Sequence, residues 1–391
     1  MPKSAAGHPT QNAVIAHQMT RALLALLLIL VQLPLAAAPR RRAVRHPSPL
    51  IVPAAIVAAA HQAAEASMAA GVPAVQIAVS HRGRVVYSEA FGMTDRESAT
   101  AATPRSVLRI ASITKQFTAA AILRLAERGA LTLDDRIEKF VPEFDNRGAT
   151  ITLRHLLSHI SGLPGEWYPP TPPFPSIKAE VTREQAIKSL NAQPLNSAPG
   201  TNWSYSNVGY LLLGYAIESI TGRPFADFIH EEFALPLGLI DTGVCGTNNL
   251  PLPDGHAFLA TVTKVPSIHT SGMLSSGSFC STASDLVRWA HLLATGHAIL
   301  PASYATMITP ARLANGNVVF DNYAMGLSAS KLLGHPAVSH SGGTLGWESF
   351  LLYLSDQEIA VAVIQNAAPA PTAVAPHSVA LTVAKAALDT L

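Results

Sequence analysis

Residues 107–135 read VLRIASITKQFTAAAILRLAERGALTLDD, which combines a helix signal with a chemical motif. The segment Ser112–Arg128 is rich in Ala, Leu and Ile, and Gly129 stops it, so we expect a helix there. Ser112 and Lys115 form a Ser-x-x-Lys motif in its first turn, where residues three apart lie on one face. The pattern therefore predicts an amine beside a hydroxyl at a helix N-terminus.

The chemistry of this motif depends on the surroundings of Lys115. A serine hydroxyl is a poor nucleophile unless a base takes its proton, and burial lowers the pKa of a lysine amine towards the useful range. The alternative is that Ser112 caps the helix while Lys115 is solvated. A second Ser-x-x-Lys, from Ser328 to Lys331, falls in an expected strand, where the two side chains point to opposite faces. We interpret this second copy as chance.

Tyr205, Ser206 and Asn207 form a second motif, in the loop before an expected helix over Val208–Ile220. A phenol near an ammonium can relay protons, and an amide can hold a substrate carbonyl. The alternative is that Tyr205 packs in the interior while Asn207 caps the helix. The residues of this motif leave both interpretations open.

A third motif, His340-Ser341-Gly342-Gly343, comes just before the strand that Trp347 opens. Glycines let a substrate backbone approach closely. The N–H groups of Gly343 and Ser112 would then stabilise the negative charge that develops on a substrate oxygen. The alternative is a turn between strands with a satisfied histidine.

In this order the three motifs resemble those of the serine β-lactamase and penicillin-binding protein superfamily, nearest its class C β-lactamase and D-peptidase or esterase branch. The family's Ser-x-x-Lys, Tyr-x-Asn and Lys-Thr-Gly (or His-x-Gly) correspond to residues 112–115, 205–207 and 340–342. The flanking text ITLRHLLSHISGLP, residues 151–164, resembles the same branch. The resemblance covers about residues 55–366.

The resemblance implies a serine hydrolase that works through an acyl-enzyme on a small ester or peptide, without a cofactor. Ser112 would be acylated, Lys115 and Tyr205 would share the acid and base work, and water would release the acyl group. Asn207 would orient the substrate, while His340 and Gly342 would line the strand edge. Lactamases of this branch usually carry lysine where His340 stands, so we expect an esterase or D-amino-acid peptidase rather than an efficient β-lactamase. The alternative function is a non-catalytic binding module for wall peptides or a protein.

Strand patterns occur at both ends of the chain. Val75–Ser80 and Arg84–Phe91 read as a hairpin, and so do Trp347–Leu354 and Ile359–Asn366. We therefore expect an α+β fold, an α/β sandwich whose antiparallel sheet is built from both termini. The hydrolase domain would span residues 54–366, with a helical subdomain at about 130–300. Residues 367–391 would add a linker and a C-terminal helix on the sheet.

The N-terminus has the layout of an export signal. The apolar run ALLALLLILVQL, residues 22–33, follows Arg21 and precedes three alanines, so we expect a signal peptide over 1–38 and a linker over 39–53. An uncleaved anchor, which would tie the protein to a membrane, is the alternative. Export to the periplasm or medium would allow a Cys245–Cys280 disulfide; two separate thiols are the other option. The formal charge of +2 gives no reason to expect nucleic-acid binding.

Three other features have competing explanations. His155 and His159 lie four apart on an expected helix, which is a spacing found in metal sites, but no acidic partner lies at a useful offset and we expect no metal. The proline-rich loop Leu163–Ser176 carries aromatic residues that would either line a pocket mouth or pack on the surface. Trp347 is expected in the core.

Overall fold

The computed structural model describes residues 52–168, 178–258 and 261–391. The expected signal peptide, all but the last two residues of the linker, and residues 169–177 of the proline-rich loop, which include its aromatic residue Phe174, lie outside the described residues. Of the helices in the described residues, none is both long and apolar enough to cross a bilayer.

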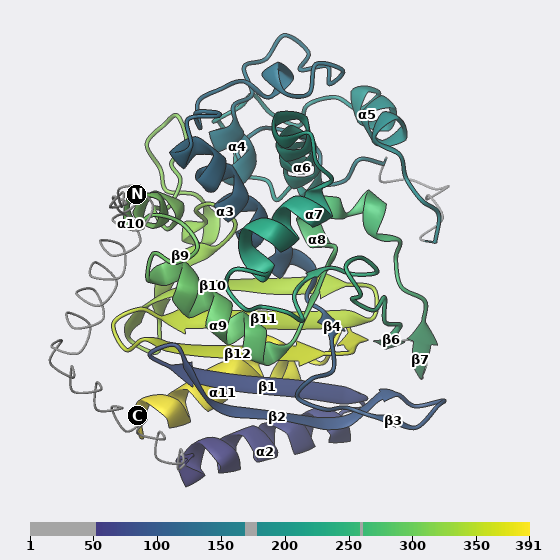
Figure 1. Cartoon of the computed structure of the whole chain (residues 1–391), viewed down its shortest axis with the longest axis vertical. Helices are drawn as coiled ribbons and strands as arrows, with labels where there is room; N and C mark the ends of the chain where they lie inside the picture. Colours follow the sequence, from purple (N-terminus) through teal and green to yellow (C-terminus); the bar gives the residue numbers. More distant parts are fainter. Residues whose placement is uncertain (1–51, 169–177, 259–260) are drawn as a thin grey trace, which may run out of the picture. The chain divides into compact units, whose positions relative to one another are not determined.

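A seven-stranded antiparallel sheet organises the fold, in the order β3-β2-β1-β12-β11-β10-β9 (Figure 1). The N-terminal strand β1 (Ala74–His81) pairs with the near-C-terminal strand β12 (Ile359–Gln365), with Ile77 opposite Val363. Both strands are rich in Val, Ile and Ala, which suits strands buried on both faces. Strands from the N-terminal and C-terminal parts of the fold therefore pair in the middle of the sheet, which confirms the α+β prediction.

Side chains alternate between the two faces of this sheet, and each face has its own core. Ile77, Val79 and Val363 join the core under helices α2 (Ala54–Ala69) and α11 (Pro376–Leu388). On the opposite face, α9 (Ala283–Ala294) packs on β1, β11 and β12. The sheet is therefore the middle layer between two layers of helix (Figure 1).

The other strands of the seven-stranded sheet are β2 (Arg84–Asp95), β3 (Thr100–Ala101), β9 (Ser328–Leu332), β10 (His335–Thr344) and β11 (Trp347–Leu354). The strands of the two smaller sheets are short: β4 (Leu108–Arg109), β5 (Gly243–Val244), β6 (Gly255–Phe258), β7 (Val262–Val265), β8 (Phe279–Ser281) and β13 (Ala367–Ala368). The other helices are α3 (Thr114–Glu127), α4 (Leu153–Leu157), α5 (Arg183–Asn191), α6 (Asn207–Thr221), α7 (Phe225–Ile229), α8 (Leu274–Gly277) and α10 (Pro301–Met307).

Both expected hairpins are present, and β11 has the predicted bounds. Trp347 is fully buried, which confirms its place in the core. The motif helix begins later than expected, because Ser112 lies in a single 3₁₀ turn, η1 (Ala111–Ile113), that precedes α3. The expected helical subdomain of residues 130–300 also includes α9, whose apolar face covers the sheet.

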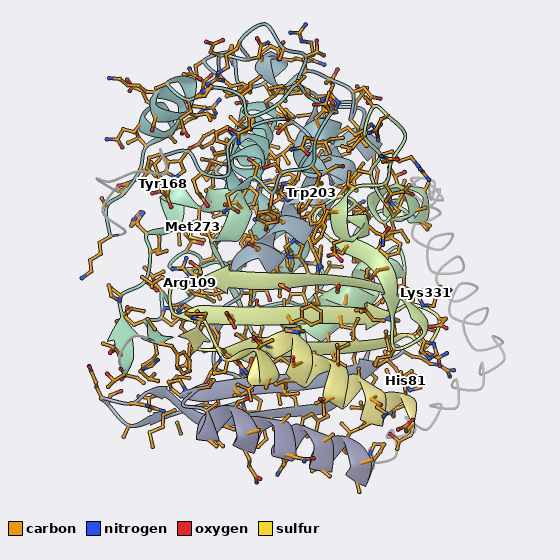
Figure 2. The ribbon with its side chains drawn as sticks, turned by 180° about the vertical axis from the view of Figure 1, so that it is seen from behind. His81, Arg109, Tyr168, Trp203, Met273 and Lys331 are labelled. Atoms are coloured by element: carbon orange, nitrogen blue, oxygen red, sulfur yellow. A yellow bond between two sulfur atoms is a disulfide. The ribbon has the colours of Figure 1, made fainter. Side chains whose placement is uncertain are left out.

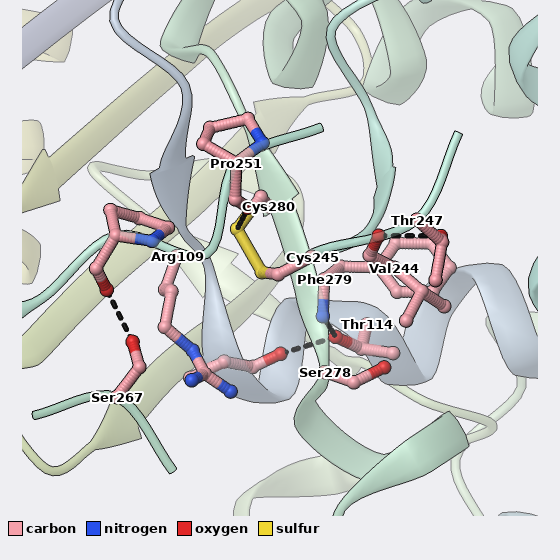
Figure 3. Close-up of a disulfide and its surroundings, with 12 residues drawn as sticks. Arg109, Thr114, Val244, Cys245, Thr247, Pro251, Ser267, Ser278, Phe279 and Cys280 are labelled. Carbon is pink, nitrogen blue, oxygen red and sulfur yellow. Dashed lines mark hydrogen bonds between the residues drawn. A yellow bond between two sulfur atoms is a disulfide. The ribbon is translucent and has the colours of Figure 1, made fainter. Parts of the chain in front are cut away.

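A small sheet of β4, β8 and β5 supports the start of the motif helix. Strand β8 lies between the other two, with Cys280 opposite both Arg109 and Gly243. Cys245 and Cys280 form a disulfide at this sheet, across a sequence separation of 35 residues (Figure 3). The disulfide therefore fastens the strand that neighbours the residues leading to Ser112.

Candidate active site

Ser112 lies on a sharp turn between β4 and α3. Ala111, the residue before it, has a φ of 45°, which is uncommon for a residue with a Cβ. Strand β8 holds both sides of the turn, since Ile110 N donates to Phe279 O at 2.9 Å and Phe279 N donates to Thr114 Oγ1 at 3.1 Å. The turn is thus fixed by bonds to a segment more than 160 residues away.

Lys115 is fully buried on the first turn of α3. Its Nζ lies 3.2 Å from Ser112 Oγ, 2.7 Å from Asn207 Oδ1 and 2.7 Å from Ser276 O. Two of these partners can only accept, so a neutral amine would give them its two N–H bonds and turn its lone pair to Ser112. Burial lowers the pKa of Lys115 to about 7, although the charge of Glu166 opposes the shift.

Tyr205 lies in the loop that leads into α6. Its ring lies 4.8 Å from Lys115 Nζ, and its hydroxyl interacts with the side chain of Ser112. Burial raises the pKa of Tyr205, and the charge of Glu166 adds to the shift, so the phenol keeps its proton at neutral pH. Ser206 rather than Asn207 caps α6, because Ser206 Oγ accepts the N–H of Gly209.

Asn207 is the first residue of α6 and links Lys115 to a carboxylate. Its Oδ1 accepts from Lys115, and its Nδ2 donates to Glu166 Oε1 at 2.6 Å. Burial raises the pKa of Glu166, while the Asn207 hydrogen bond and the charge of Lys115 oppose the rise. The alternative in which Asn207 caps this helix is wrong, because Ser206 is the cap.

His340, Gly342 and Gly343 lie within strand β10, not in a turn before the next strand. Strand β9 pairs with β10 only as far as Ser339, so among the described residues the rest of β10 has no strand partner on that side. Strands β10 and β11 both contact η1. A Cβ on Gly342 would overlap Ile110 O and Ser349 Oγ, so only glycine permits this approach.

His340 is buried and neutral. Its Nε2 lies 3.0 Å from the hydroxyl of Tyr323, and its Nδ1 lies 2.6 Å from Ser341 O. A carbonyl only accepts, so Nδ1 carries the proton and Nε2 accepts from Tyr323. Burial lowers the pKa of His340 to about 3, with a further contribution from the charge of Lys115. His340 therefore brings no positive charge to the site at neutral pH.

Two cavities meet the motif residues. The first, of about 440 Å³, is lined by Glu166, Asn207 and Gly343 together with Trp167, Tyr168 and Met273. The second, of about 320 Å³, is lined by Ser112, Tyr205 and His340 together with Trp203, Asp321 and Tyr323. Figure 2 shows Tyr168 and Met273 near each other and Trp203 apart from them. Trp167 and Tyr168 thus line a pocket, as one of the two interpretations of their loop expected.

The arrangement of the motifs agrees with a comparison to known proteins. The family model described as Beta-lactamase matches residues 60–384. The chain belongs to the beta-lactamase family. It is 30% identical over 303 residues to penicillin-binding protein 4* of Bacillus subtilis (strain 168), an alignment that covers 73% of this chain and 66% of that protein.

Two further relatives of this chain are named after hydrolytic activities. Esterase EstB of Burkholderia gladioli is 30% identical over 273 residues, which cover 60% of this chain and 68% of the esterase. A solved D-stereospecific amidohydrolase from Streptomyces sp. superposes with a TM-score of 0.69 at 27% identity, covering 84% of this chain and 97% of that one. The chain spans about two thirds of the length of the two curated relatives, 66% and 68%.

The structure brings the three sequence motifs together and adds residues that the sequence analysis missed. Glu166 and Tyr323 contact motif residues, yet neither is part of a motif. Ser276 contributes only its carbonyl, for which a side-chain pattern carries no signal. Glu166 stands three residues after Leu163, inside the proline-rich loop and directly before Trp167, which was the one available hint.

The expected pair of histidines on one helix is wrong. Helix α4 ends at Leu157, so His155 lies on the helix and His159 beyond it, with a φ of 60°. His155 Nδ1 accepts the N–H of Thr152 in a capping box, whereas His159 is buried against Tyr205. Within the described ranges, no three His, Cys, Asp or Glu residues gather as metal ligands would. The second Ser-x-x-Lys lies on β9, with Lys331 exposed.

Proposed function

We propose that the protein is a serine hydrolase that moves an acyl group from an ester or amide to Ser112 and then to water. The observation that carries this proposal is the position of Lys115, whose Nζ lies 3.2 Å from Ser112 Oγ while two acceptors occupy its other bonds. The relatives named as an esterase and as an amidohydrolase support both bond types.

In the first step, neutral Lys115 takes the proton of Ser112 as Oγ attacks the substrate carbonyl carbon. The tetrahedral oxygen would be stabilised by the N–H groups of Ser112 and Gly343. The bond to the leaving group then breaks, and Tyr205, still protonated, returns a proton to the departing oxygen or nitrogen. Lys115 reprotonates Tyr205. A water molecule then attacks the carbonyl of the acyl-enzyme with the same proton transfers, which releases the acid product and frees Ser112.

The charges around the two cavities favour particular substrates. Of the described residues that line them, Glu166 and Asp321 are carboxylates and none is Lys or Arg. His340, which lines the second cavity, is neutral. A substrate carboxylate would therefore meet like charge, and no Lys or Arg side chain in either lining would offset it. We propose an ester or amide whose leaving group is uncharged, rather than a β-lactam or a peptide with a free carboxylate.

Export is part of the proposal. Residues 1–38 would act as a signal peptide, and the Cys245–Cys280 disulfide fits an oxidising compartment. Residues 54–366 would form the hydrolase domain, with α11 packed on its sheet. The N-terminal sequence of the mature protein, determined by mass spectrometry of the exported form, tests the cleavage.

The direct test replaces Ser112 by alanine. Wild-type protein should hydrolyse p-nitrophenyl acetate and react with a fluorophosphonate probe, and Ser112→Ala should lose both by a factor of about 10³ or more. Ser330→Ala, on strand β9, is the matched control and should keep both. Labelling that persists in Ser112→Ala would remove Ser112 from its role. A folded wild-type protein that is silent toward esters, amides and the probe would favour the non-catalytic binding module.

The proposed leaving-group preference has its own assay. Phenyl acetate and 3-carboxyphenyl acetate differ by one carboxylate and have similar leaving groups. We expect kcat/KM to be roughly tenfold or more higher for the uncharged ester, since about 1.4 kcal/mol of repulsion has that effect. Equal values, or a preference for the carboxylate, would contradict the proposed substrate class and leave the hydrolase proposal intact.

A further inference from the structure

His159 contacts the chain on both sides of Tyr205. The N–H of Ser204 donates to His159 O at 2.9 Å, and the N–H of Ser206 donates to His159 Nδ1 at 3.1 Å. The ring of His159 also lies against the ring of Tyr205, with 4.2 Å between centroids. One residue thus holds the backbone before Tyr205, the backbone after it and the side chain itself.

The end of α4 explains why His159 can reach this loop. The N–H of Ile160 donates to His155 O and the N–H of His159 lies 3.4 Å from Leu156 O, which is the bonding pattern of a Schellman motif. His159 occupies its left-handed position, with a φ of 60°. Glycine is usual at this position and asparagine is the next most common residue. A histidine here is uncommon, which suggests that its side chain has a function.

The hydrogen bond from Ser206 also fixes the chemical state of His159. A ring nitrogen that accepts an N–H carries no proton, so Nδ1 is bare and Nε2 is protonated. The side chain is 1% exposed, and its ring lies near those of Tyr210 and Tyr323. Burial, aided by the charge of Lys115, holds the pKa of His159 well below its usual value. The imidazole is therefore neutral, and its ring lies among the rings of three tyrosines.

We propose that His159 is a positioning residue that holds the Tyr205 side chain beside Ser112 and Lys115. This inference rests on the proposed function. His159 acts through Tyr205, because its acceptor nitrogen and its carbonyl are both engaged by the loop that carries the tyrosine.

Two variants at this position separate the imidazole from the backbone. His159→Gly relaxes the left-handed residue and removes the acceptor. His159→Asn also tolerates that conformation, and its Oδ1 stands where Nδ1 stood, one bond from Cγ. We expect His159→Gly to lower kcat for p-nitrophenyl acetate by about 10²-fold with little change in KM, which is the size of effect expected when a catalytic group is misplaced by about 1 Å. His159→Asn should regain at least half of that loss on a logarithmic scale.

A double-mutant cycle shows whether the effect passes through Tyr205. In a Tyr205→Phe background the hydroxyl is already absent, so His159→Gly should cost less than about threefold there. His155→Ala, on α4 four residues before His159 and outside the loop contacts, is the matched control and should keep wild-type kcat. Circular dichroism of all variants checks that the fold is retained.

The outcomes separate this inference from the function on which it rests. An active wild type with folded His159→Gly at full kcat would overturn the positioning role, and so would losses that add independently of Tyr205→Phe. A His159→Asn variant as impaired as His159→Gly would also overturn it. A wild type without hydrolase activity, or Tyr205→Phe at full activity, would instead reject the proposed mechanism.

Discussion

Lys115 Nζ and Asn207 Oδ1 lie 2.7 Å apart although 92 positions separate them in the sequence. Lys115 is on the first turn of α3 and Asn207 opens α6, so the N-terminal ends of two helices meet at this bond. The N-terminal end of each helix carries a partial positive charge, and the two together disfavour a protonated, positively charged Lys115 between them. The arrangement therefore adds to burial in favouring the neutral amine that the proposed mechanism needs.

The pH dependence of activity should follow Lys115. With a pKa of about 7, the base-competent neutral amine increases as pH rises and reaches half its maximum near pH 7. We expect kcat/KM for phenyl acetate to increase between about pH 6 and pH 8 and then level off. Lys115→Arg cannot lose its proton and should be inactive across that range.

A matched control and a contrary result are available for this prediction. Lys331→Ala changes the exposed lysine of the second Ser-x-x-Lys and should leave the profile unchanged. A profile that is flat from pH 6 to pH 8 in wild type would contradict Lys115 as the titrating base.

Glu166→Gln should move that profile to lower pH. The charge of Glu166 raises the pKa of Lys115, so its removal lets the pKa fall and the neutral amine appears at more acidic pH. Glutamine keeps an oxygen that can accept from Asn207 Nδ2, so the site geometry is preserved. The midpoint of kcat/KM against pH measures the shift. A midpoint that stays in place or moves upward would contradict the coupling between the two side chains.

The close approach of β10 to η1 makes Gly342 sensitive to any side chain. Gly342→Ala would force Ile110 O and Ser349 Oγ away, and Ser349 Oγ now donates to Ile110 O at 2.8 Å beside the turn that carries Ser112. We expect a loss of kcat/KM of about 10²-fold. Gly343→Ala is the matched comparison, since its Cβ meets no described atom within 4 Å and its N–H remains.

The two glycine variants should differ clearly in activity. The kcat/KM of Gly343→Ala should be at least tenfold higher than that of Gly342→Ala. Equal losses would mean that space at β10 does not explain the requirement for glycine at position 342.

Reduction of the Cys245–Cys280 disulfide should destabilise the protein. Closing a loop across 35 residues lowers the entropy of the unfolded chain, which corresponds to about 3–4 kcal/mol in the free energy of unfolding. Urea unfolding with and without reductant measures the difference. The double variant Cys245→Ala, Cys280→Ala should unfold at the same urea concentration in both conditions. If the urea midpoint of the wild-type protein did not change with reductant, the Cys245–Cys280 disulfide would be contradicted.

Local sequence patterns predicted the elements whose signals lie within a few residues. Strand β11 has the expected bounds, and β1, β2 and β12 differ from expectation by a few residues at their ends. Their β-branched residues and turn residues act on the backbone nearby, so the pattern is readable without the fold. The same applies to α6, whose start at the Tyr205 motif was expected within one residue.

The helix that was expected to hold both His155 and His159 shows where local patterns fail. Nothing in its composition requires a stop at Leu157, because no glycine or proline stands there. The left-handed conformation of His159 is stabilised by bonds to Ser204 and Ser206, which lie more than 40 positions further along the chain. A competition between local and distant partners is visible only once the chain is folded.

The sequence alone determined the residue types and spacing of the three motifs, and with them the family and the central sheet, because these depend on covalent order and local propensity. The tertiary structure decided the chemistry. Only the fold buries Lys115, neutralises His340 and brings Glu166 to Asn207 across 41 positions. A pKa depends on solvent exclusion and neighbouring charges, and both are set by which distant segments pack together.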